Sequence, residues 1–385
     1  MFNVHDYERN AYMLHGAERY CGYDWWWHSF TAQDAETGAD QPFFIEFFVC
    51  NPALGGPEPV FGQLPENRAA GKRPSYLMVK VGAWGKNPCQ LHRFFGWDEV
   101  RIHDGAPYWV QAGDCHASEF RLSGSVAVSQ ADAAAHPEWM CDAGSMRFDL
   151  HMDKQIAFNV GYGTSAPFRE LETFAMFWHA EGMKTAFSGT VEFNGRRYVV
   201  TPEKSFGYAD KNWGRDFTTP WLWLASSDLV SRKTGKRLEH SAFDIGGGRP
   251  KVYFVPIERR LLGVFCYEGK EYDFNFSHLW LNVKTEFSFT EGDELMTWHV
   301  RQENIHAVME TEIFCRRSEM LWIHYEAPNG ERRHNRLWNG GNGWGTVKLY
   351  EKEHGKPVLI DTVDVGHVGC EYGEYTEKDT NEQAV

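Results

Sequence analysis

Positive charge is scarce in this chain of 385 residues. Lys and Arg number 39 against 53 Asp and Glu, which gives a formal net charge of −14 at pH 7. Nucleic acid and anionic membrane surfaces are therefore not expected as partners. Long apolar runs are also missing, so no transmembrane helix is expected. The polar N-terminal stretch lacks the apolar region of a signal peptide, which predicts a cytoplasmic location.

Familiar catalytic and metal-binding signatures are missing too. The eight cysteines are scattered without a C-x-x-C pair, which argues against a zinc ribbon and favours free thiols. The chain has no G-x-S-x-G, H-E-x-x-H or P-loop sequence. The Gly-rich segment 338–350 leads into a predicted strand, so it does not indicate dinucleotide binding. The 17 histidines are dispersed, and no metal site is expected.

Helical periodicity is rare, whereas strand-like alternation is common. Asn194-Gly195 is a strong two-residue hairpin turn between apolar runs. One short helix is predicted within residues 161–179. The pattern predicts strands at Phe43–Val49, Tyr76–Trp84, Phe120–Ser129, Phe187–Val200, Lys251–Ile257, Leu279–Thr290 and Gly345–Lys352. Many short strands separated by turns predict an all-β fold, a sandwich or barrel with few short helices.

A faint internal repeat suggests two β units. Residues 23–49 begin with alternating tryptophans, reach a Thr-Gly turn and return through an apolar strand. Residues 220–246 follow the same order at nearly the same spacing. Two units of about 190 residues fit the usual size of a domain. We therefore predict an N-terminal domain over residues 1–185 and a C-terminal domain over residues 186–385.

Aromatic side chains are what the chain has in excess, at 15% of its residues. On a strand Trp25 and Trp27 share one face, and His28 lies on the other. Trp221 and Trp223 share a face in the same way. Aromatic residues supply the core of a β protein, and they also form the walls of pockets for apolar ligands.

A few ionisable groups interrupt these aromatic runs. Glu46 lies within "FFIEFFV", His179 follows "FAMFW", Asp210 and Lys211 precede Trp213, and Glu371 lies in "GCEYGEY". Each one alone is most simply a hydrogen-bonded or rim residue. Together they indicate an aromatic cavity that binds an apolar ligand and delivers a proton to it, because burial raises the pKa of a carboxyl group. Aromatic faces can stabilise a developing cation.

Residues 207–223 resemble the signature of the tocopherol cyclase family, roughly G-Y-x-E-K-[ND]-W-G-x-x-F-P-x-x-W-x-W. Asp210 stands where the family usually has Glu, and Thr218 stands where Pro is usual. The resemblance implies two lipocalin-like antiparallel β-barrel domains. It also implies apolar polyene or prenylated substrates and no cofactor, as in carotenoid hydratases and Diels–Alderase-like cyclases. The chain keeps the signature at Gly207, Tyr208, Lys211, Asn212, Trp213, Gly214, Phe217, Trp221 and Trp223.

Three hypotheses follow for the signature. The first is a cofactor-independent cyclase, isomerase or hydratase acting on an alkene or enone of an apolar, phenolic or prenylated small molecule. In it Asp210 is the best candidate acid, Lys211 or His179 orients it, and Glu46 and Glu371 are further candidates. Its substrate-binding residues are predicted to be Trp25, Trp27, His28, Tyr208, Trp213, Trp221 and Trp223. The second is a non-catalytic carrier of an apolar molecule. The third is a structural ion pair of Asp210 with Lys211 or Arg215 at the domain junction.

Overall fold

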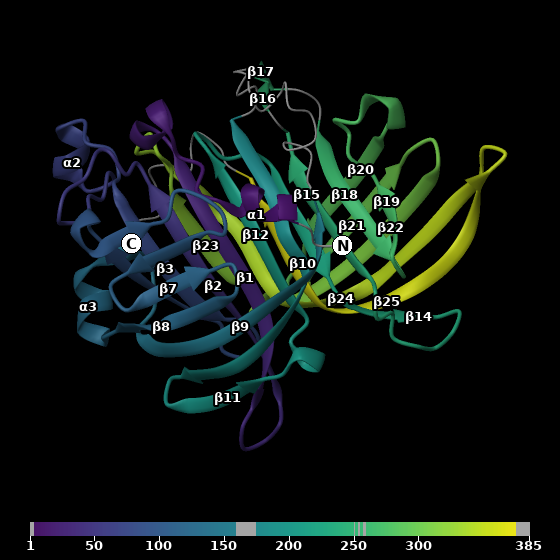
Figure 1. Cartoon of the computed structure of the whole chain (residues 1–385), viewed down its shortest axis with the longest axis horizontal. Coiled ribbons are helices and arrows are strands. Elements are labelled where there is room, and N and C mark those ends of the chain that lie inside the picture. Colours follow the sequence, from purple (N-terminus) through teal and green to yellow (C-terminus); the bar gives the residue numbers. More distant parts are fainter. Residues whose placement is uncertain (1–3, 159–174, 250, 253–254, 257–258, 375–385) are drawn as a thin grey trace.

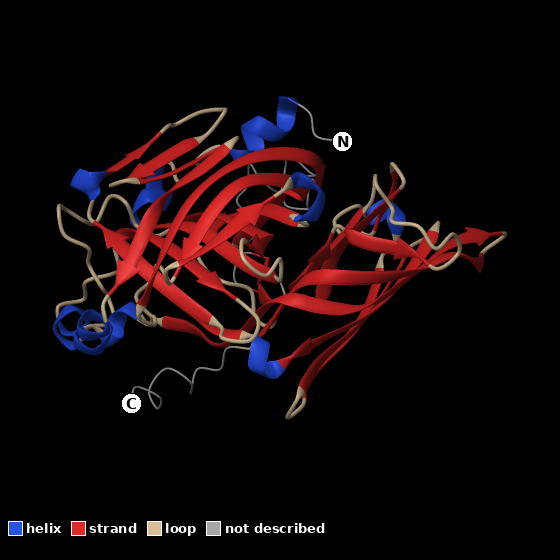
Figure 2. Ribbon diagram, turned by 90° about the horizontal axis from the view of Figure 1, so that it is seen from below, coloured by secondary structure: helices blue, strands red, loops and turns tan. Residues whose placement is uncertain are grey.

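Two large antiparallel sheets make up most of the protein, as Figure 2 shows. The computed structural model describes residues 4–158, 175–249, 251–252, 255–256 and 259–374. Most strands of the N-terminal half lie on one side of the molecule and most strands of the C-terminal half on the other (Figure 1). The predicted all-β, lipocalin-like class with few short helices is confirmed.

The first sheet has twelve strands in the order β4-β3-β2-β1-β11-β10-β9-β8-β7-β6-β5, with β12 pairing with β1 and β10. The sheet curls until Arg93 Nη1 on β4 donates to the carbonyl of Ser125 on β8 at 3.1 Å. Its strands are β1 (Tyr23–Asp34), β2 (Asp40–Cys50), β3 (Tyr76–Ala83), β4 (Cys89–Phe95), β5 (Val100–Ile102), β6 (Trp109–Ala112), β7 (Cys115–Ser118), β8 (Arg121–Val128), β9 (Gly144–Phe158), β10 (Met176–Phe193), β11 (Arg196–Val200) and β12 (Gly207–Gly214).

The second sheet has eleven strands, in the order β19-β18-β15-β13-β25-β24-β22-β21-β20, with β14 and β23 pairing at its side. It curls as well, since Gln302 Nε2 on β21 donates to the carbonyl of Leu261 on β18 at 3.0 Å. Its strands are β13 (Trp221–Ser226), β14 (Asp228–Ser231), β15 (Ala242–Gly248), β18 (Arg260–Tyr267), β19 (Lys270–Asp273), β20 (Lys284–Glu291), β21 (Leu295–Glu303), β22 (Ala307–Arg316), β23 (Leu321–Glu326), β24 (Arg332–Glu353) and β25 (Lys356–Gly373).

The remaining elements are short. Strands β16 (Lys251–Val252) and β17 (Val255–Pro256) form a separate two-stranded pair. None of the helices in the described residues has the length and apolar character needed to traverse a bilayer. The helices are α1 (Val4–Asn10), α2 (Pro65–Ala69) and α3 (Gln130–Ala135), with 3₁₀ turns η1 (Gly16–Tyr20), η2 (Trp97–Glu99), η3 (Pro137–Trp139), η5 (Pro202–Lys204), η6 (Leu279–Leu281) and η7 (Arg317–Glu319).

Turn chemistry explains the hairpin that the sequence predicts most strongly. Asn194 and Gly195 join β10 to β11, and both have positive φ (50° and 78°), as the two central residues of such a turn require. Two other predictions need correction. Residues 279–281 form a 3₁₀ turn with exposed Leu279 and Trp280, so the strand begins only at Lys284. The described part of residues 251–257 forms two very short paired strands rather than one.

The helix predicted within residues 161–179 lies mostly outside the described residues. Its described end, Met176–His179, belongs to strand β10. The division into domains at 185/186 stays a prediction. Strand pairing changes from the first sheet to the second between Gly214 and Trp221, because β10, β11 and β12 all pair within the first sheet.

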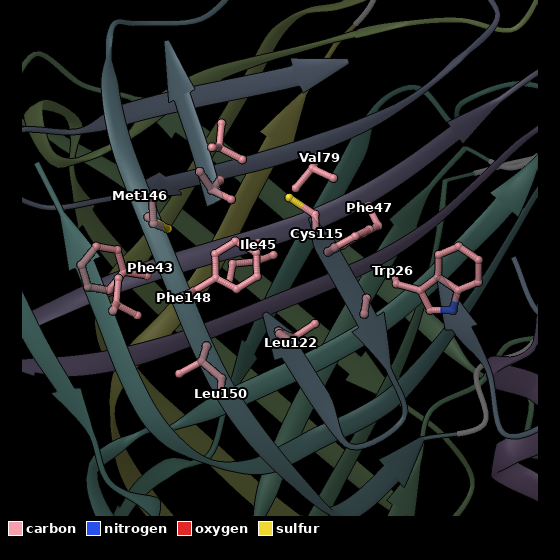
Figure 3. Close-up of a cluster of buried hydrophobic side chains, with 14 of the residues drawn as sticks. Trp26, Phe43, Ile45, Phe47, Val79, Cys115, Leu122, Met146, Phe148 and Leu150 are labelled. Carbon is pink, nitrogen blue, oxygen red and sulfur yellow. The ribbon is translucent and has the colours of Figure 1, made fainter. Parts of the chain in front are cut away.

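Apolar side chains gather in three places. One core lies inside the curl of the first sheet and includes Trp26, Phe43 and Phe148 (Figure 3). A second core lies within the second sheet. The third packs the sheets against each other and is rich in aromatic rings, with Trp25 and Trp27 from β1 and Trp221 and Trp223 from β13. The predicted opening hairpins thus bring their tryptophans to one junction.

Candidate functional site

Two neighbouring strands, β1 and β12, determine which side chains reach the junction between the sheets. In their antiparallel register Trp27 lies opposite Asp210, and Trp26 lies opposite Lys211. Residues opposite each other in such a pair point to the same side of the sheet. Trp27 and Asp210 therefore point toward the second sheet, whereas Trp26 and Lys211 point into the curl of the first sheet. We call these two sides the junction face and the inner face.

An aromatic cavity lies on the junction face. It leaves about 30 Å³ open to the centres of water molecules, which is room for about two waters at roughly 10–15 Å³ each. Both sheets supply its walls, so the cavity exists only where they meet. Its lining residues are Trp25, Trp27, Met176 and Asp210 from the first sheet, and Trp221, Trp223, Tyr325, Leu337 and Glu371 from the second.

Asp210 presents a buried carboxyl group to this cavity. Trp178 Nε1 donates to its Oδ2 at 2.9 Å, and the Tyr208 hydroxyl lies 3.4 Å from the same oxygen. Its other oxygen, Oδ1, is buried and makes no hydrogen bond of ordinary length among the described residues, although the Trp25 indole lies close enough to lower the pKa of Asp210. Burial raises the pKa of Asp210 well above its usual range, the Trp178 hydrogen bond lowers it in part, and the charge of Glu371 raises it further.

A second carboxyl group, Asp244 on β15, lies behind Asp210. Tyr208 donates to Asp244 Oδ2 at 3.0 Å, and Trp223 Nε1 lies 3.2 Å from Asp244 Oδ1. Burial and then the charge of Asp210 raise the pKa of Asp244 well above its usual range. The sequence analysis missed Asp244, although the signal was available: it is an acid within the apolar stretch "AFDIGGG", just as Glu46 is within "FFIEFFV".

Glu371 on β25 is the other carboxyl group that lines the cavity. Its Oε2 accepts a hydrogen bond from Trp221 Nε1 at 2.7 Å, and its Oε1 accepts one from the Asn339 side-chain amide. Burial raises the pKa of Glu371 to about 7, although the two hydrogen bonds oppose that rise. A carboxyl group with this pKa exchanges its proton near neutral pH.

Glu46 lies near the cavity but does not line it. Its Oε2 forms an ion pair with Lys80 Nζ at 2.9 Å and accepts a hydrogen bond from the Tyr325 hydroxyl at 3.0 Å. Lys80 Nζ also lies 3.6 Å from the centre of the Tyr325 ring. Glu46 therefore supports the Tyr325 wall of the cavity and is balanced by a cation.

Lys211 lies on the inner face, away from Asp210. Its ammonium group is fully buried and pairs with the Asp24 carboxylate. The Lys211 Nζ atom lies 3.9 Å from the centre of the Trp26 ring. Arg215 forms an ion pair with Glu18, with 3.6 Å between Arg215 Nε and Glu18 Oε1. The ion pair of Asp210 with Lys211 or Arg215 that the third hypothesis requires is thus replaced by contacts of Asp210 with Trp178 and Tyr208.

The two histidines of the predicted site also lie on the inner face. His28 Nε2 is 3.4 Å from the Tyr108 hydroxyl and 3.6 Å from Glu181 Oε1. His179 lies opposite Lys211 across β10 and β12. Burial lowers the pKa of each imidazole to about 3, so both are neutral at pH 7. Neither histidine lines the cavity, and His179 does not contact Asp210 within the described residues.

Trp213 and Tyr208 take up different positions from those expected. The Trp213 ring stacks on Phe177 with 5.5 Å between ring centres, and it does not line the cavity. Tyr208 lies behind the wall, where it contacts Asp210 and Asp244. Tyr325 does line the cavity, and the sequence analysis missed it, because β23 is brought there by pairing with β24 rather than by a local pattern.

Metal binding has no evident place among the described residues, where no group of three or more His, Cys, Asp and Glu side chains is arranged to hold an ion. All eight cysteines are free thiols. The groups that line or support the cavity are carboxyl groups, indole and phenol hydrogen-bond donors, and aromatic faces.

Comparisons with known proteins agree with the resemblance of residues 207–223. The model of the family described as tocopherol cyclase-like matches residues 138–373. Among solved structures, CghA is 11% identical, with a TM-score of 0.48 over 92% of this chain and 88% of CghA. Kievitone hydratase from Nectria haematococca is 11% identical, with a TM-score of 0.44 over 95% of this chain and 97% of that one. No curated protein sequence matches.

Proposed function

This chain belongs to the tocopherol cyclase-like family, and from that premise we propose that it is a cofactor-independent enzyme acting on an apolar small molecule. It adds an O–H group across a carbon–carbon double bond by acid–base catalysis. When the O–H group belongs to the substrate, the enzyme is an intramolecular cyclase. When it belongs to water, the enzyme is a hydratase.

The observation that carries this proposal is the Asp210 carboxyl group in the wall of an aromatic cavity. Burial raises its pKa well above the usual range, which favours the acid form that can donate a proton. Asp210 Oδ1 makes no hydrogen bond of ordinary length among the described residues. A bound substrate therefore has an unoccupied oxygen of the acid to meet.

Trp27 offers a second unoccupied polar atom at the same wall. Its indole Nε1 is buried without a hydrogen-bond partner among the described residues, and its side chain lines the cavity with Asp210. An unpaired buried N–H is costly, and an oxygen acceptor on the ligand would satisfy it. The substrate that fits carries a carbonyl or phenol oxygen close to its double bond, as an enone or a prenylated phenol does.

The proposed reaction leaves the proton count unchanged. Asp210 gives its proton to one alkene carbon, which forms a C–H bond and leaves positive charge on the neighbouring carbon. The faces of Trp25, Trp221 and Trp223 stabilise that charge. The attacking oxygen forms a C–O bond and releases its proton to a carboxylate, either Asp210 itself or Glu371, whose pKa of about 7 suits this exchange.

The size of the cavity sets a requirement for substrate entry. Space for about two waters is too small for a prenylated or polyene molecule, so wall side chains must move. Met176 is the most adaptable of them, because an unbranched thioether chain has several rotamers of similar energy. A ligand-bound structure is expected to show a larger cavity with Met176 displaced.

The carrier hypothesis makes a different demand on the same cavity. A carrier needs apolar walls but no ionisable group that faces its ligand. Asp210 and Glu371 both line the cavity, which supports an enzyme. A ligand that co-purifies and is released unchanged after long incubation would support a carrier instead.

Turnover in heavy water tests the proposal. The wild type is incubated with a panel of prenylated phenols, prenylated quinols and enones, and products are analysed by mass spectrometry. We expect one carbon-bound deuteron per product molecule, and a rate about 10²–10⁴-fold lower for Asp210→Asn. Asp149→Asn, at an exposed aspartate paired with Arg121, is the control and should match the wild type. Full turnover by Asp210→Asn combined with Glu46→Gln and Glu371→Gln would exclude this function.

A further inference from the structure

Asp210 and Asp244 come from different sheets and meet at a single hydroxyl group. Tyr208, two residues before Asp210 on the same face of β12, places its hydroxyl 3.4 Å from Asp210 Oδ2 and 3.0 Å from Asp244 Oδ2. Trp223 Nε1 lies 3.3 Å from the Tyr208 hydroxyl and 3.2 Å from Asp244 Oδ1. Asp210 and Trp223 line the cavity, whereas Asp244 does not.

The contacts from Asp210 through Tyr208 to Asp244 limit how many protons these three side chains can hold. A phenol carries one proton and can donate it to only one acceptor at a time. If both aspartates were ionised, one of the two Tyr208 contacts would join two oxygen lone pairs with no proton between them. If one aspartate is an acid, its O–H donates to Tyr208, and Tyr208 donates to the other carboxylate. One added proton therefore satisfies the whole chain.

The charges around the pair favour retention of that proton. Glu371 on β25 and Glu181 on β10 are negative groups that act on Asp210, and Tyr325 on β23 also interacts with it. The charged group that acts on Asp244 is Asp210, which raises the pKa of Asp244. Hydrogen bonds from Tyr208 and Trp223 lower that pKa. Both aspartates are buried, Asp244 completely. Two carboxylates that contact the same hydroxyl group in a buried site repel each other strongly.

We propose that Asp210 and Asp244 share a proton through the Tyr208 hydroxyl, and that Asp244 is a positioning residue that keeps Asp210 in its acid form. Asp244 reaches the reacting atoms only through Tyr208. In a reaction cycle, which rests on the proposed function, the Asp210 O–H bond breaks as the substrate C–H bond forms. The pair then carries no extra proton until the attacking oxygen forms its C–O bond and releases its own proton to Asp210, which restores the shared proton.

The titration of the two aspartates tests the sharing without any substrate. The full chain is labelled with ¹³C at the aspartate carboxyl carbon and followed by NMR against pH, with Asp210→Asn and Asp244→Asn assigning the two signals. In the wild type we expect two coupled transitions separated by more than about one pH unit. In Asp244→Asn we expect a single Asp210 transition below the upper wild-type one, because the negative neighbour is gone.

Tyr208→Phe isolates the role of the hydroxyl, and it removes a single oxygen atom. The two transitions should move closer together, because the singly protonated state loses the chain of hydrogen bonds. Tyr76→Phe is the matched control: Tyr76 is also buried and donates to a buried carboxylate, Glu326, at 3.3 Å. In that variant the signals of Asp210 and Asp244 should not move.

Several results would overturn the inference. One is a wild type in which both aspartates are ionised at pH 7, and another is a Tyr208→Phe variant that titrates like the wild type. Both measurements remain decisive if Asp244→Asn does not fold. If the titrations are coupled as expected but Asp210→Asn keeps full turnover, the proton is shared and the proposed function fails. If turnover depends on Asp210 but the titrations are independent, the function stands and the sharing fails.

Discussion

The two faces of the β1–β12 pair accommodate buried carboxyl groups in different ways. On the inner face a lysine accompanies the acids: Lys211 pairs with Asp24, and Lys154 pairs with Glu119 and Glu181. On the junction face Asp210, Asp244 and Glu371 receive hydrogen bonds from indole, phenol and amide groups instead. A lysine beside a buried acid opposes the rise in pKa that burial causes, and so favours the anion. An acid that faces only neutral donors can keep a proton and give it away.

One acid on each face, Glu46 and Glu181, differs from its neighbours, and in both cases the lysines beside the acid account for the difference. Glu46 lies on the junction side, but it is paired with Lys80 and does not line the cavity. Glu181 lies on the inner side, but it shares Lys154 with Glu119, and burial with this incomplete compensation raises its pKa to about 7. Burial raises the pKa of each of these acids, and the lysines beside them oppose that rise.

The largest predicted effect comes from removing a cation from the inner face. Lys211→Met leaves Asp24 buried without its partner, which should lower the free energy of unfolding by about 3–5 kcal/mol. Denaturant unfolding measures this change. Arg121→Gln is the control, because the exposed pair of Arg121 with Asp149 contributes about 0–1 kcal/mol. Equal losses in the two variants would show that the buried pair has no special role.

The next effect concerns Glu371 on the junction face and its contribution to the pH dependence of the protein's stability. The pKa of Glu371 is raised by burial from 4.5 in the unfolded chain to about 7 in the folded protein. Between these values the folded state holds a proton that the unfolded state has released, so stability falls as pH rises from about 4.5 to about 7. The contribution is fully present below this window and absent above it.

Glu371→Gln should remove this part of the pH dependence. Unfolding measured at several pH values should give a profile that is flatter by up to about 3 kcal/mol across the window. The exposed residue Glu312 provides the control variant, Glu312→Gln, which should reproduce the wild-type slope. A Glu371→Gln profile as steep as that of the wild type would assign the dependence to other groups, Glu181 first among them.

A smaller effect is expected from the indole that donates to Glu371. Trp221→Phe removes the hydrogen bond to Oε2, which favours the ionised form. The pKa of Glu371 should therefore rise above about 7, by about one unit for a hydrogen bond of about 1–1.5 kcal/mol. A ¹³C-glutamate NMR titration measures the shift. A pKa that falls or stays constant would mean that the indole does not stabilise the carboxylate.

The smallest effect should be that of Asp210→Asn on stability. If Asp210 is already an acid in the folded protein, the amide replaces it with nearly the same shape and no change in charge. The free energy of unfolding near pH 7 should change by about 1 kcal/mol or less, which is the range for one altered hydrogen bond. A loss of several kcal/mol, like that expected for Lys211→Met, would indicate that Asp210 is an ionised partner of a cation.

The comparison also shows what the sequence could reveal. Strand alternation predicts the shared faces of Trp25 with Trp27 and of Trp221 with Trp223, and the Asn194-Gly195 turn predicts its hairpin. Alternation also places neighbours on a strand, such as Asp210 and Lys211, on opposite faces, so the predicted contact between them was inconsistent with an extended β12.

Other features of the site depend on pairing between distant strands. Asp244 reaches Tyr208 because β15 pairs with β13 and the second sheet packs on the first. Tyr325 reaches the cavity through β23, about 280 residues after Glu46, whose carboxylate it contacts. No local pattern encodes such contacts, because register and sheet packing are determined by the whole chain.

Neutron diffraction from a crystal exchanged into heavy water near pH 7 locates each deuteron, and so shows whether Asp210 and Asp244 share a proton. We expect a deuteron on Asp210 or Asp244 in line with the Tyr208 oxygen, and none on Asp24, whose carboxylate faces Lys211. Bare carboxylates at both Asp210 and Asp244 would contradict it, because Asp210 would then have no proton to give to the substrate.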